Sequence, residues 1–402
     1  MRKTKLALAI SATFIATSAV ATNGTNMIAV GAQANAMGGT GVAAYYGAEN
    51  VIDNPGMIGK TQSTEFSFGG TIFMPNVSSD NGAGSMDSKA DLNIIPSVSL
   101  ASRINDSLTF GVGMYGTSGM GVDYSGDDAV SGSLFQAQTQ MQIMRFVPTL
   151  AYNQDNFGLG FSPVIQYSAL DVNYNMMGTN YGSGMAQDIG YGFNAGGYVD
   201  LSNKVTLGFS YQSAIEMDFD KVLETASQPF KDFNFITETF GNKLEQPAEL
   251  KAGIAYNMDN IILTADFKQV RWSEAKGYKD FGWEDQNVIA VGAKYSGNNY
   301  WLGAGINKAD NPIKAGNIAT GPAQKPGTIN LFNNLFFPAT TEMHYSLGGG
   351  YNLNKNTTLE GALVYAPETK TTVDTINMGA GVGSNTTKHS QLGYSISVRY
   401  NF

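Results

Sequence analysis

The stretch 388–402 alternates between two kinds of side chain, and this pattern constrains the fold more than any other feature of the chain. Because successive side chains of a strand point to opposite faces, the segment has one apolar face and one polar face. Aromatic rings gather toward the end of the apolar row, as they do at a membrane interface. The apolar row is Leu392, Tyr394, Ile396, Val398, Tyr400 and Phe402, and the polar row is Gln391, Gly393, Ser395, Ser397, Arg399 and Asn401. The pattern predicts the closing strand of an outer-membrane β-barrel.

The composition agrees with a chain of many strands and tight turns with one face in lipid. Charged residues make up 14% of the chain, below the usual quarter or so, and glycine accounts for 48 of the 402 residues. The net charge of −9 and the absence of a basic stripe exclude nucleic acid as an expected partner. The chain has no cysteine, so a disulfide framework and a thiolate metal site are both excluded.

The N-terminus has the features of a secretory signal peptide. Arg2, Lys3 and Lys5 supply positive charge, residues 6–20 are apolar or small, and residues 19–21 read Ala-Val-Ala. We therefore expect residues 1–21 to be a signal peptide. Beyond it, no run of 18 or more apolar residues predicts a membrane helix.

From residue 61 onward the chain reads as fourteen strand candidates, and an even number is what bacterial single-chain barrels require. They are predicted at 61–74, 89–101, 106–116, 141–153, 156–173, 185–201, 203–217, 246–257, 259–275, 284–296, 298–308, 340–353, 355–367 and 388–402. Short connections alternate with long ones at 75–88, 117–140, 174–184, 218–245, 276–283, 309–339 and 368–387. Barrels have short periplasmic turns and long extracellular loops. The sequence thus predicts an all-β membrane protein, a 14-stranded antiparallel transmembrane barrel over residues 61–402.

Residues 22–60 do not alternate and are rich in glycine, alanine and asparagine. A segment of this length is too short for its own core, so we expect it to pack inside a larger host. The obvious host is the lumen of the barrel, where the segment would form an N-terminal hatch that plugs it. Asn54, Pro55 and Gly56 form a turn signal within this segment.

These features together resemble the FadL-type outer-membrane transporters of long-chain fatty acids and hydrocarbons. The resemblance covers the whole chain after the signal peptide and depends on the order and spacing of short motifs. These are 24–26 (GTN), 36–42 (AMGGTGV), 54–56 (NPG), 270–273 (VRWS), 305–307 (GIN), 310–313 (DNPI) and 400–402 (YNF). The family usually has Asn-Pro-Ala where this chain has Asn54-Pro55-Gly56, so the hatch turn is expected to be more mobile here. The resemblance implies passive transport of hydrophobic molecules from an external groove through a lumen pocket to a lateral gap beside a kinked third strand.

The third predicted strand contains Gly111, Gly113 and Gly116 in a GxGxxG pattern. No helix pattern follows, so a dinucleotide site is not indicated. Glycine within a strand marks a bulge, a bend or a close approach of another backbone. The resemblance implies that these glycines form the kink that opens the barrel wall, and the alternative is close packing of the hatch against a glycine-rich strand.

Two of the long loops, 218–245 and 309–339, carry more apolar side chains than exposed loops usually do. Because exposed apolar patches usually signal binding, the loops are candidates for capturing a hydrocarbon chain. The candidate capture residues are Phe230, Phe233, Phe235, Leu335, Phe336 and Phe337. The alternative is that the two loops pack on each other and cap the barrel.

Charged side chains on the polar faces of the strands should point inward, since a lipid-facing Arg or Lys at the bilayer centre costs roughly 2–4 kcal/mol. A fatty-acid carboxylate would bind one of these cations, and Arg145, Lys268 and Lys294 are the candidates. The alternative role is to hold the hatch through ion pairs. An uncharged hydrocarbon would need none of them.

The leading hypothesis is passive uptake of hydrophobic small molecules, most of all long-chain fatty acids, with no cofactor, no metal and no enzymatic activity. The alternatives are a channel for aromatic or other uncharged hydrocarbons and, in a different class, an outer-membrane hydrolase. Only His344 and His389 could serve as a histidine base, and no G-x-S-x-G or H-E-x-x-H motif is present. Expected partners are outer-membrane lipids, lipopolysaccharide and the barrel-assembly machinery, with the protein itself a monomer.

Overall fold

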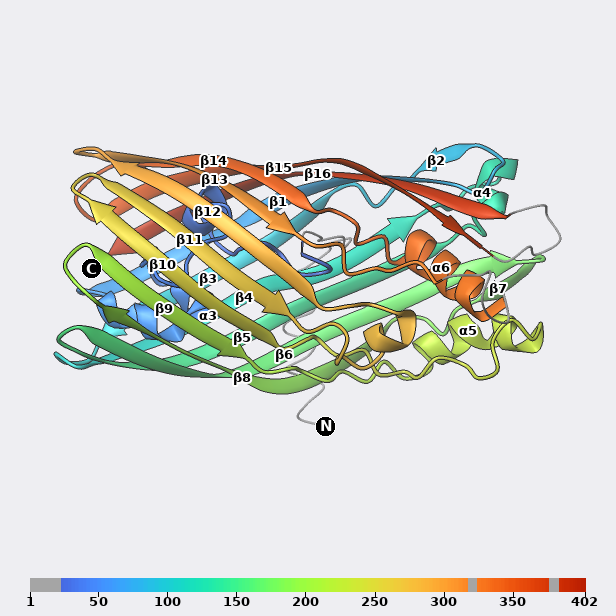
Figure 1. Ribbon diagram of the computed structural model, residues 1–402, viewed down its shortest axis with the longest axis horizontal. Coiled ribbons are helices and arrows are strands. Elements are labelled where there is room, and N and C mark those ends of the chain that lie inside the picture. Colours follow the sequence, from blue (N-terminus) through green and yellow to red (C-terminus); the bar gives the residue numbers. More distant parts are fainter. Residues whose placement is uncertain (1–22, 317–323, 376–382) are drawn as a thin grey trace.

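The computed structural model describes residues 23–316, 324–375 and 383–402, and within them fourteen strands close into one antiparallel barrel (Figure 1). The predicted fold class is therefore confirmed. The barrel strands are β1 (Thr64–Asp80), β3 (Asn93–Arg103), β4 (Leu108–Asp123), β5 (Gln138–Gln154), β6 (Phe157–Met176), β8 (Ala186–Asp200), β9 (Val205–Gln212), β10 (Glu249–Met258), β11 (Ile261–Val270), β12 (Gln286–Ser296), β13 (Tyr300–Ala309), β14 (Met343–Asn352), β15 (Thr357–Asp374) and β16 (Ser384–Asn401). The expected signal peptide at 1–21 lies outside the described residues.

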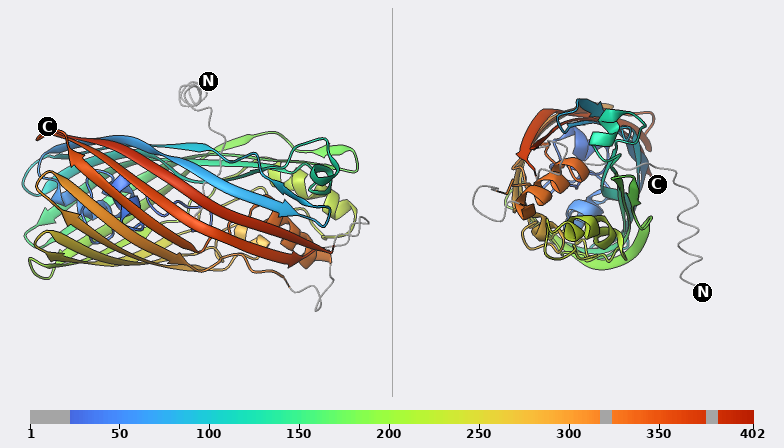
Figure 2. Two further views of the ribbon diagram at one scale, coloured as in Figure 1. Left: turned by 90° about the horizontal axis from the view of Figure 1, so that it is seen from above. Right: turned by 90° about the vertical axis from the view of Figure 1, so that its right-hand side faces the viewer.

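Each barrel strand pairs with its neighbour in the sequence, and the first and last strands close the ring. β1 pairs with β16 from Glu65 opposite Asn401 to Asp80 opposite Thr386, and Figure 2 shows the closed ring end-on. This pairing closes the two outer edges of the sheet, where unpaired backbone groups would otherwise face a bilayer with no water to bind.

The alternation of apolar and polar residues along the strands sorts side chains between lipid and lumen. On β16, Tyr394 and Ile396 are 42% and 55% exposed on the outer surface, whereas Ser395 and Ser397 are buried in the interior. The same division appears on β13, where Leu302 is exposed outward and Trp301 is buried. No helix in the described part of the chain is long and apolar enough to cross a membrane.

Several strands differ in length from the prediction. These differences lie mainly at the end of the barrel that carries the long loops. β1 runs to Asp80, β4 to Asp123 and β15 to Asp374, so the predicted loops 75–88, 117–140 and 368–387 are partly strand. These extensions are rich in serine, threonine and glycine, and the sequence pattern there lost its apolar row because no lipid faces it. β9 and β11 end earlier than predicted, at Gln212 and Val270.

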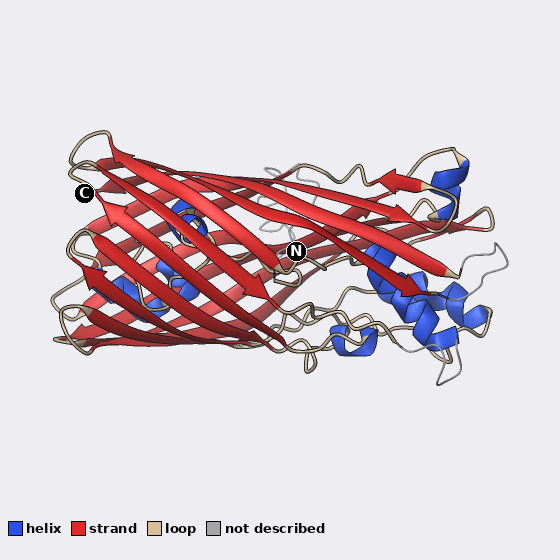
Figure 3. Ribbon diagram, turned by 45° about the horizontal axis from the view of Figure 1, so that its top comes forward, coloured by secondary structure: helices blue, strands red, loops and turns tan. Residues whose placement is uncertain are grey.

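The two ends of the barrel differ as the loop lengths predicted. Short turns and the C-terminus lie at one end, here called the short-turn end, and the opposite, long-loop end carries most of the helices (Figures 1 and 3). The elements of the long-loop end are α4 (Ala129–Ser133), α5 (Val222–Asp232), α6 (Gln324–Phe336), the 3-10 helix η2 (Tyr278–Phe281) and the short strands β2 (Ser85–Asp87) and β7 (Thr179–Tyr181).

Residues 23–60 lie inside the barrel, toward the short-turn end, and are called the hatch below (Figure 1). They form α2 (Ala32–Ala36), α3 (Asn50–Asp53) and the 3-10 helix η1 (Pro55–Lys60). The rest of the hatch is irregular, and it satisfies its backbone groups largely through side chains of the hatch and of the barrel wall.

Candidate functional site

Asn54, the first residue of the predicted hatch turn, fastens two parts of the hatch to the wall. Its side-chain amide donates to the Val42 carbonyl at 2.6 Å and to the Gly197 carbonyl of β8 at 2.9 Å. Its side-chain oxygen accepts from the Gly56 amide at 3.0 Å, and this bond caps η1, whose first residue is Pro55. An asparagine side chain can donate two hydrogen bonds and accept on its oxygen, so Asn54 uses both of its polar atoms.

A carboxylate of the wall fastens a second point of the hatch. Asp266 on β11 accepts from the backbone amides of Gly41 and Val42, at 2.7 and 3.0 Å. These amides begin an irregular stretch, so without Asp266 they would be buried without an acceptor. No local sequence pattern indicates this role of Asp266.

Arg399 near the end of β16 forms ion pairs with three carboxylates, Glu49 of the hatch and Glu65 and Glu360 of the wall. The shortest, to Glu360, is 3.1 Å. One guanidinium with five donors can bind several acceptors at once, and the resulting cluster joins hatch to wall near the short-turn end. This arrangement matches the alternative role considered for lumen charges, a network that holds the hatch.

Glycines on the inner wall mark where the hatch backbone touches the barrel. A methyl group on Gly292 of β12 would lie 2.6 Å from the Met37 carbonyl oxygen, and one on Gly348 of β14 would lie 2.5 Å from Ala36 Cβ. On β13, a methyl group on Gly305 would overlap the backbone of Gly38. From the sequence, the high glycine content was interpreted as many strands and tight turns, and close packing of the hatch was considered only for the third strand. The signal of this contact surface in the sequence was glycine at inward-facing positions of consecutive strands.

The third barrel strand, β4, loses its pairing with β3 partway along its length. The register between them ends at Ser97 opposite Tyr115, although β4 continues to Asp123 beside β5. Two local features explain the end of pairing. Pro96 of β3 has no amide hydrogen to donate, and β4 has a register shift between Gly116 and Ser118.

The freed edge of β4 pairs with the beginning of the hatch. The Met27 amide donates to the Thr117 carbonyl at 3.0 Å, and the Gly119 amide donates to the Thr25 carbonyl at 3.2 Å. The Ser118 hydroxyl also donates to Thr25, whose own hydroxyl oxygen lies 2.9 Å away. A short segment of the hatch therefore occupies the position that β3 vacates, and we call this segment, Thr25–Met27, the gap strap.

The three glycines of the predicted kink have different surroundings. Gly116 adjoins the register shift, as expected of a kink. A methyl group on Gly111 would lie 2.7 Å from Ile58 and 2.8 Å from Val51 of the hatch, and one on Gly113 would overlap the Tyr115 ring. Gly111 thus matches the alternative role, close packing of the hatch, and Gly113 makes room for a buried tyrosine.

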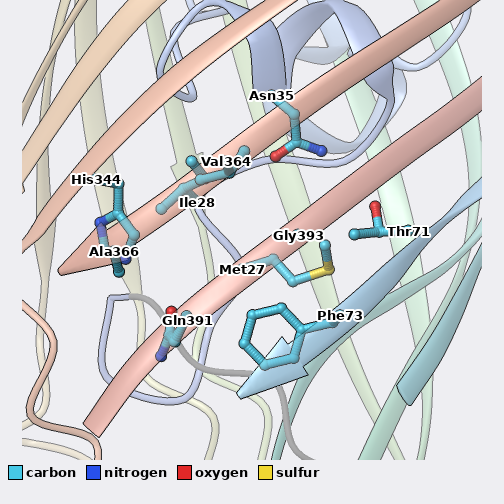
Figure 4. A pocket seen from close by; sticks show the side chains of 10 residues that line it. All are labelled: Met27, Ile28, Asn35, Thr71, Phe73, His344, Val364, Ala366, Gln391 and Gly393. Atoms are coloured by element: carbon cyan, nitrogen blue, oxygen red, sulfur yellow. The ribbon is translucent and has the colours of Figure 1, made fainter. Parts of the chain in front are cut away.

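A recess between the gap strap and the wall is lined mainly by apolar side chains (Figure 4). Met27 and Ile28 of the hatch face Phe73, Val364 and Ala366 of the wall across it. Four polar side chains also line it, those of Asn35, Thr71, His344 and Gln391. His344 and Gln391 are both buried.

A second recess is lined by charged groups. Lys251 lies between two carboxylates, 3.5 Å from Asp53 and 3.2 Å from Glu249. Lys268 is directly opposite Lys251 on the neighbouring strand and lines the same recess. Among the described residues, no carboxylate lies within ion-pair distance of Lys268, although the charges of Glu249, Asp53 and Asp266 act on its ammonium group.

The other two candidates for a headgroup contact are engaged. Arg145 donates to the side-chain oxygens of Gln166 and Gln212, at 2.9 and 2.6 Å. Lys294 lies 3.4 Å from the Gln33 side-chain oxygen and over the Tyr46 ring, so it contacts the hatch. The structure does not bring Arg145, Lys268 and Lys294 together into one site.

The apolar residues of the long loops pack against one another to form a cap over the barrel. Phe332 of α6 stacks on Phe281 and meets Phe240 edge-on, with ring centroids 5.3 and 5.1 Å apart. Four of the predicted capture residues are buried in this cap: Phe230, Leu335, Phe336 and Phe337. They match the alternative considered for these loops, because the two loops pack on each other and bury each other's apolar side chains. Of the six candidate capture residues, only Phe233 is exposed, at 45%. Its ring stacks on that of Phe235, which is partly buried.

No cluster of three or more His, Asp or Glu side chains that could hold a metal occurs within the described part of the chain. Glu342 and His344 lie two residues apart, but Glu342 is exposed and His344 is buried. They therefore do not form a common site.

Comparisons with known proteins agree with this geometry. A family model described as "Outer membrane protein transport protein (OMPP1/FadL/TodX)" matches residues 8–402. A curated relative from Escherichia coli strain CFT073, named long-chain fatty acid transport protein, is 23% identical over 78% of this chain and 82% of its own length. Another, the 47 kDa outer membrane protein of Pasteurella multocida, is 21% identical over 88% of this chain and 87% of its own.

Solved structures of low sequence identity share the fold. A Pseudomonas aeruginosa FadL homologue superposes with a TM-score of 0.72 at 15% identity, covering 94% of this chain and 100% of its own. The Pseudomonas putida toluene transporter TodX superposes with a TM-score of 0.69 at 16% identity, covering 95% of this chain and 100% of its own.

Proposed function

The chain belongs to the OMPP1/FadL/TodX family of outer-membrane transport proteins, and from this premise we propose that it carries long-chain fatty acids passively across the outer membrane of a Gram-negative bacterium. In that membrane the long-loop end faces the outside and the short-turn end faces the periplasm. The substrate enters at the cap, passes the two lumen recesses and leaves through the side wall. Residues 23–60 block the direct path to the periplasm.

The choice of an acid as substrate is supported by Lys268. Of the three candidate cations it alone, within the described residues, has neither an ion pair nor a hydrogen bond, and it lines a recess. An ammonium group in such a position can bind a carboxylate through a charge-assisted hydrogen bond. The fatty acid transport protein named among the relatives supports the same choice.

The lateral exit is supported by the interrupted pairing of β3 and β4. The opening between them is covered by the gap strap rather than by a continuous strand. Three residues of irregular chain can be displaced at much lower cost than a paired strand, because fewer hydrogen bonds break. An alkyl chain leaving there would pass directly into the hydrocarbon of the bilayer.

Entry is supported by the composition of the cap. Phe233 and Phe235 form a stacked pair at its surface, over a buried aromatic interior. An alkyl chain gains roughly 0.8 kcal/mol for each CH₂ it buries, so an apolar cap can extract it from the outer surface. The substrate would have to separate the cap loops to pass.

Replacing Lys268 with methionine tests the assignment of the substrate. Loss of a hydrogen bond to a charged group costs about 1.5–3 kcal/mol, so affinity for oleate should fall roughly 10- to 100-fold. Uptake of an uncharged alkane of similar length should not change. The matched control is Lys204→Met, which removes an exposed lysine from a turn at the short-turn end. Oleate uptake by the Lys268 variant equal to that of the control would refute the assignment.

A second candidate, transport of uncharged hydrocarbons, is favoured by the recess beside the gap strap, which is largely apolar and contains no cationic residue. Two of the solved structures that share the fold are those of toluene transporters. The same Lys268 experiment separates the candidates, because an uncharged substrate is indifferent to the loss of the ammonium group.

A further inference from the structure

Three lysines lie on the outer surface of the barrel at the long-loop ends of two adjacent strands and of a third strand that β14 separates from them along the wall. Lys308 is on β13, Lys370 on β15 and Lys388 on β16, and all three are exposed. They point away from the lumen, since the residues beside them in the sequence are turned inward. Ala309 and His389 are buried on the lumen side of β13 and β16.

These lysines lie just above the part of the wall that faces lipid. On β13, Lys308 follows the exposed Leu302 and Ile306 on the same outward face. On β16, Lys388 shares its face with Tyr394 and Ile396, which lie nearer the short-turn end. The change from apolar to cationic side chains on one face of a strand places the lysines at the level of the headgroups of the outer leaflet.

Lys370 and Lys388 are directly opposite each other in the register of β15 and β16. Like charges in this position destabilise a sheet unless a counter-ion lies between them. None of the ten ion pairs found among the described residues includes Lys308, Lys370 or Lys388. The undescribed stretches 1–22, 317–323 and 376–382 contain no Asp or Glu, so they supply no carboxylate either.

We propose that this surface, Lys308, Lys370 and Lys388, binds the phosphate groups of a phosphorylated glycolipid of the outer leaflet, namely lipopolysaccharide. The opposed pair on β15 and β16 holds one phosphate between two ammonium groups, and Lys308 lies two strands away for a second. Lysine binds phosphate as a point charge, and juxtamembrane lysines are attracted to anionic lipid surfaces. The site lies on the outside of the barrel, above the apolar part of the wall, and not in the lumen, so it acts independently of the proposed transport path.

The test compares purified wild-type barrel with the double variant Lys370→Gln, Lys388→Gln. Binding of purified lipopolysaccharide in detergent should weaken on the order of 30-fold, if each lysine contributes as cations near anionic membranes do. The matched control, Lys204→Gln with Lys355→Gln, removes two exposed lysines at the short-turn end and should leave binding unchanged within about twofold. Heat-modified electrophoretic mobility shows that each variant is folded.

Two further arms identify the ligand. Lipopolysaccharide stripped of its lipid A phosphates should bind wild type and double variant equally weakly, and inorganic phosphate at the same concentration should not displace the intact lipid. Equal binding of intact lipopolysaccharide by the double variant and the control would overturn the proposal. Displacement by inorganic phosphate would overturn it also, because the surface would then be a site for the free ion.

Discussion

Replacing Asn54 with alanine should loosen the hatch without unfolding the barrel. The change removes three hydrogen bonds, to the Val42 carbonyl, the Gly197 carbonyl and the Gly56 amide, with lengths of 2.6, 2.9 and 3.0 Å. At about 1 kcal/mol for each, the loss is about 3 kcal/mol, and it is larger if any of the three groups stays buried without a partner. Since every 1.4 kcal/mol is tenfold, the locally open hatch should become roughly 100-fold more populated.

Hydrogen exchange measures this population directly. The Met57 amide donates to the Asn54 carbonyl within the hatch, and it should lose about two decades of protection in the variant. Amides of β12 should keep theirs, because the barrel ladder is not touched. The matched control, Asn298→Ala, alters an exposed asparagine at the short-turn end. If Met57 exchanges at the same rate in the variant and the control, Asn54 does not anchor the hatch.

Three other perturbations test separate parts of the account. Deleting residues 23–60 should raise the permeability of the barrel to a polar sugar, and unchanged leakage in a liposome-swelling assay would show that these residues are no plug. Gly305→Val should displace α2 from the wall, because the side chain overlaps the Gly38 backbone, and limited proteolysis of the hatch should accelerate compared with Gly361→Val. Leu347→Arg, at a position 62% exposed to lipid, should lower the free energy of unfolding by about 2–4 kcal/mol, and a loss under 0.5 kcal/mol in a urea titration would place Leu347 outside the bilayer.

The barrel could be predicted because its determinants are local in the sequence. The alternation on β16 follows from the two-residue repeat of a strand. The number of strands can be counted from the turns between them. Boundaries were less accurate at the long-loop end. There, β1 and β15 continue beyond the bilayer, and the apolar row that signals a strand disappears while the hydrogen-bonded ladder goes on.

The interior could be predicted only in part, because its contacts join residues distant in the sequence. Asn54 was found through its turn signal, but Asp266 is 224 residues from Val42 and no local pattern connects them. Gly111 and Gly113 illustrate the same limit. The resemblance implied a kink at these glycines, with close packing of the hatch as the alternative, and the neighbours of Gly111 are hatch side chains. The interruption of β3 had a local signal in Pro96, which removes a ladder donor, and this signal was overlooked.

The cap shows why apolar loop residues do not by themselves indicate an open binding surface. Phe336 and Phe337 are almost fully buried, since α6 and the loop that contains α5 cover each other. Tyr174 of β6 contacts both loops, with its ring 6.1 Å from Phe230 and 5.4 Å from Phe336. Substrate entry consequently requires these packed rings to separate. Opening of the cap therefore depends on the apolar surface of the substrate.

The most direct test of the account locks the gap strap to the wall. The chain has no cysteine, so a Thr25→Cys, Ser118→Cys pair forms a single defined disulfide across hydroxyl oxygens now 2.9 Å apart. The matched control, Thr40→Cys with Thr264→Cys, joins hatch to β11 across hydroxyl oxygens 2.8 Å apart, away from the opening. The account predicts that oxidation stops oleate uptake in the first pair alone and that reduction restores it. Unchanged uptake through the oxidised first pair would contradict exit through the side wall.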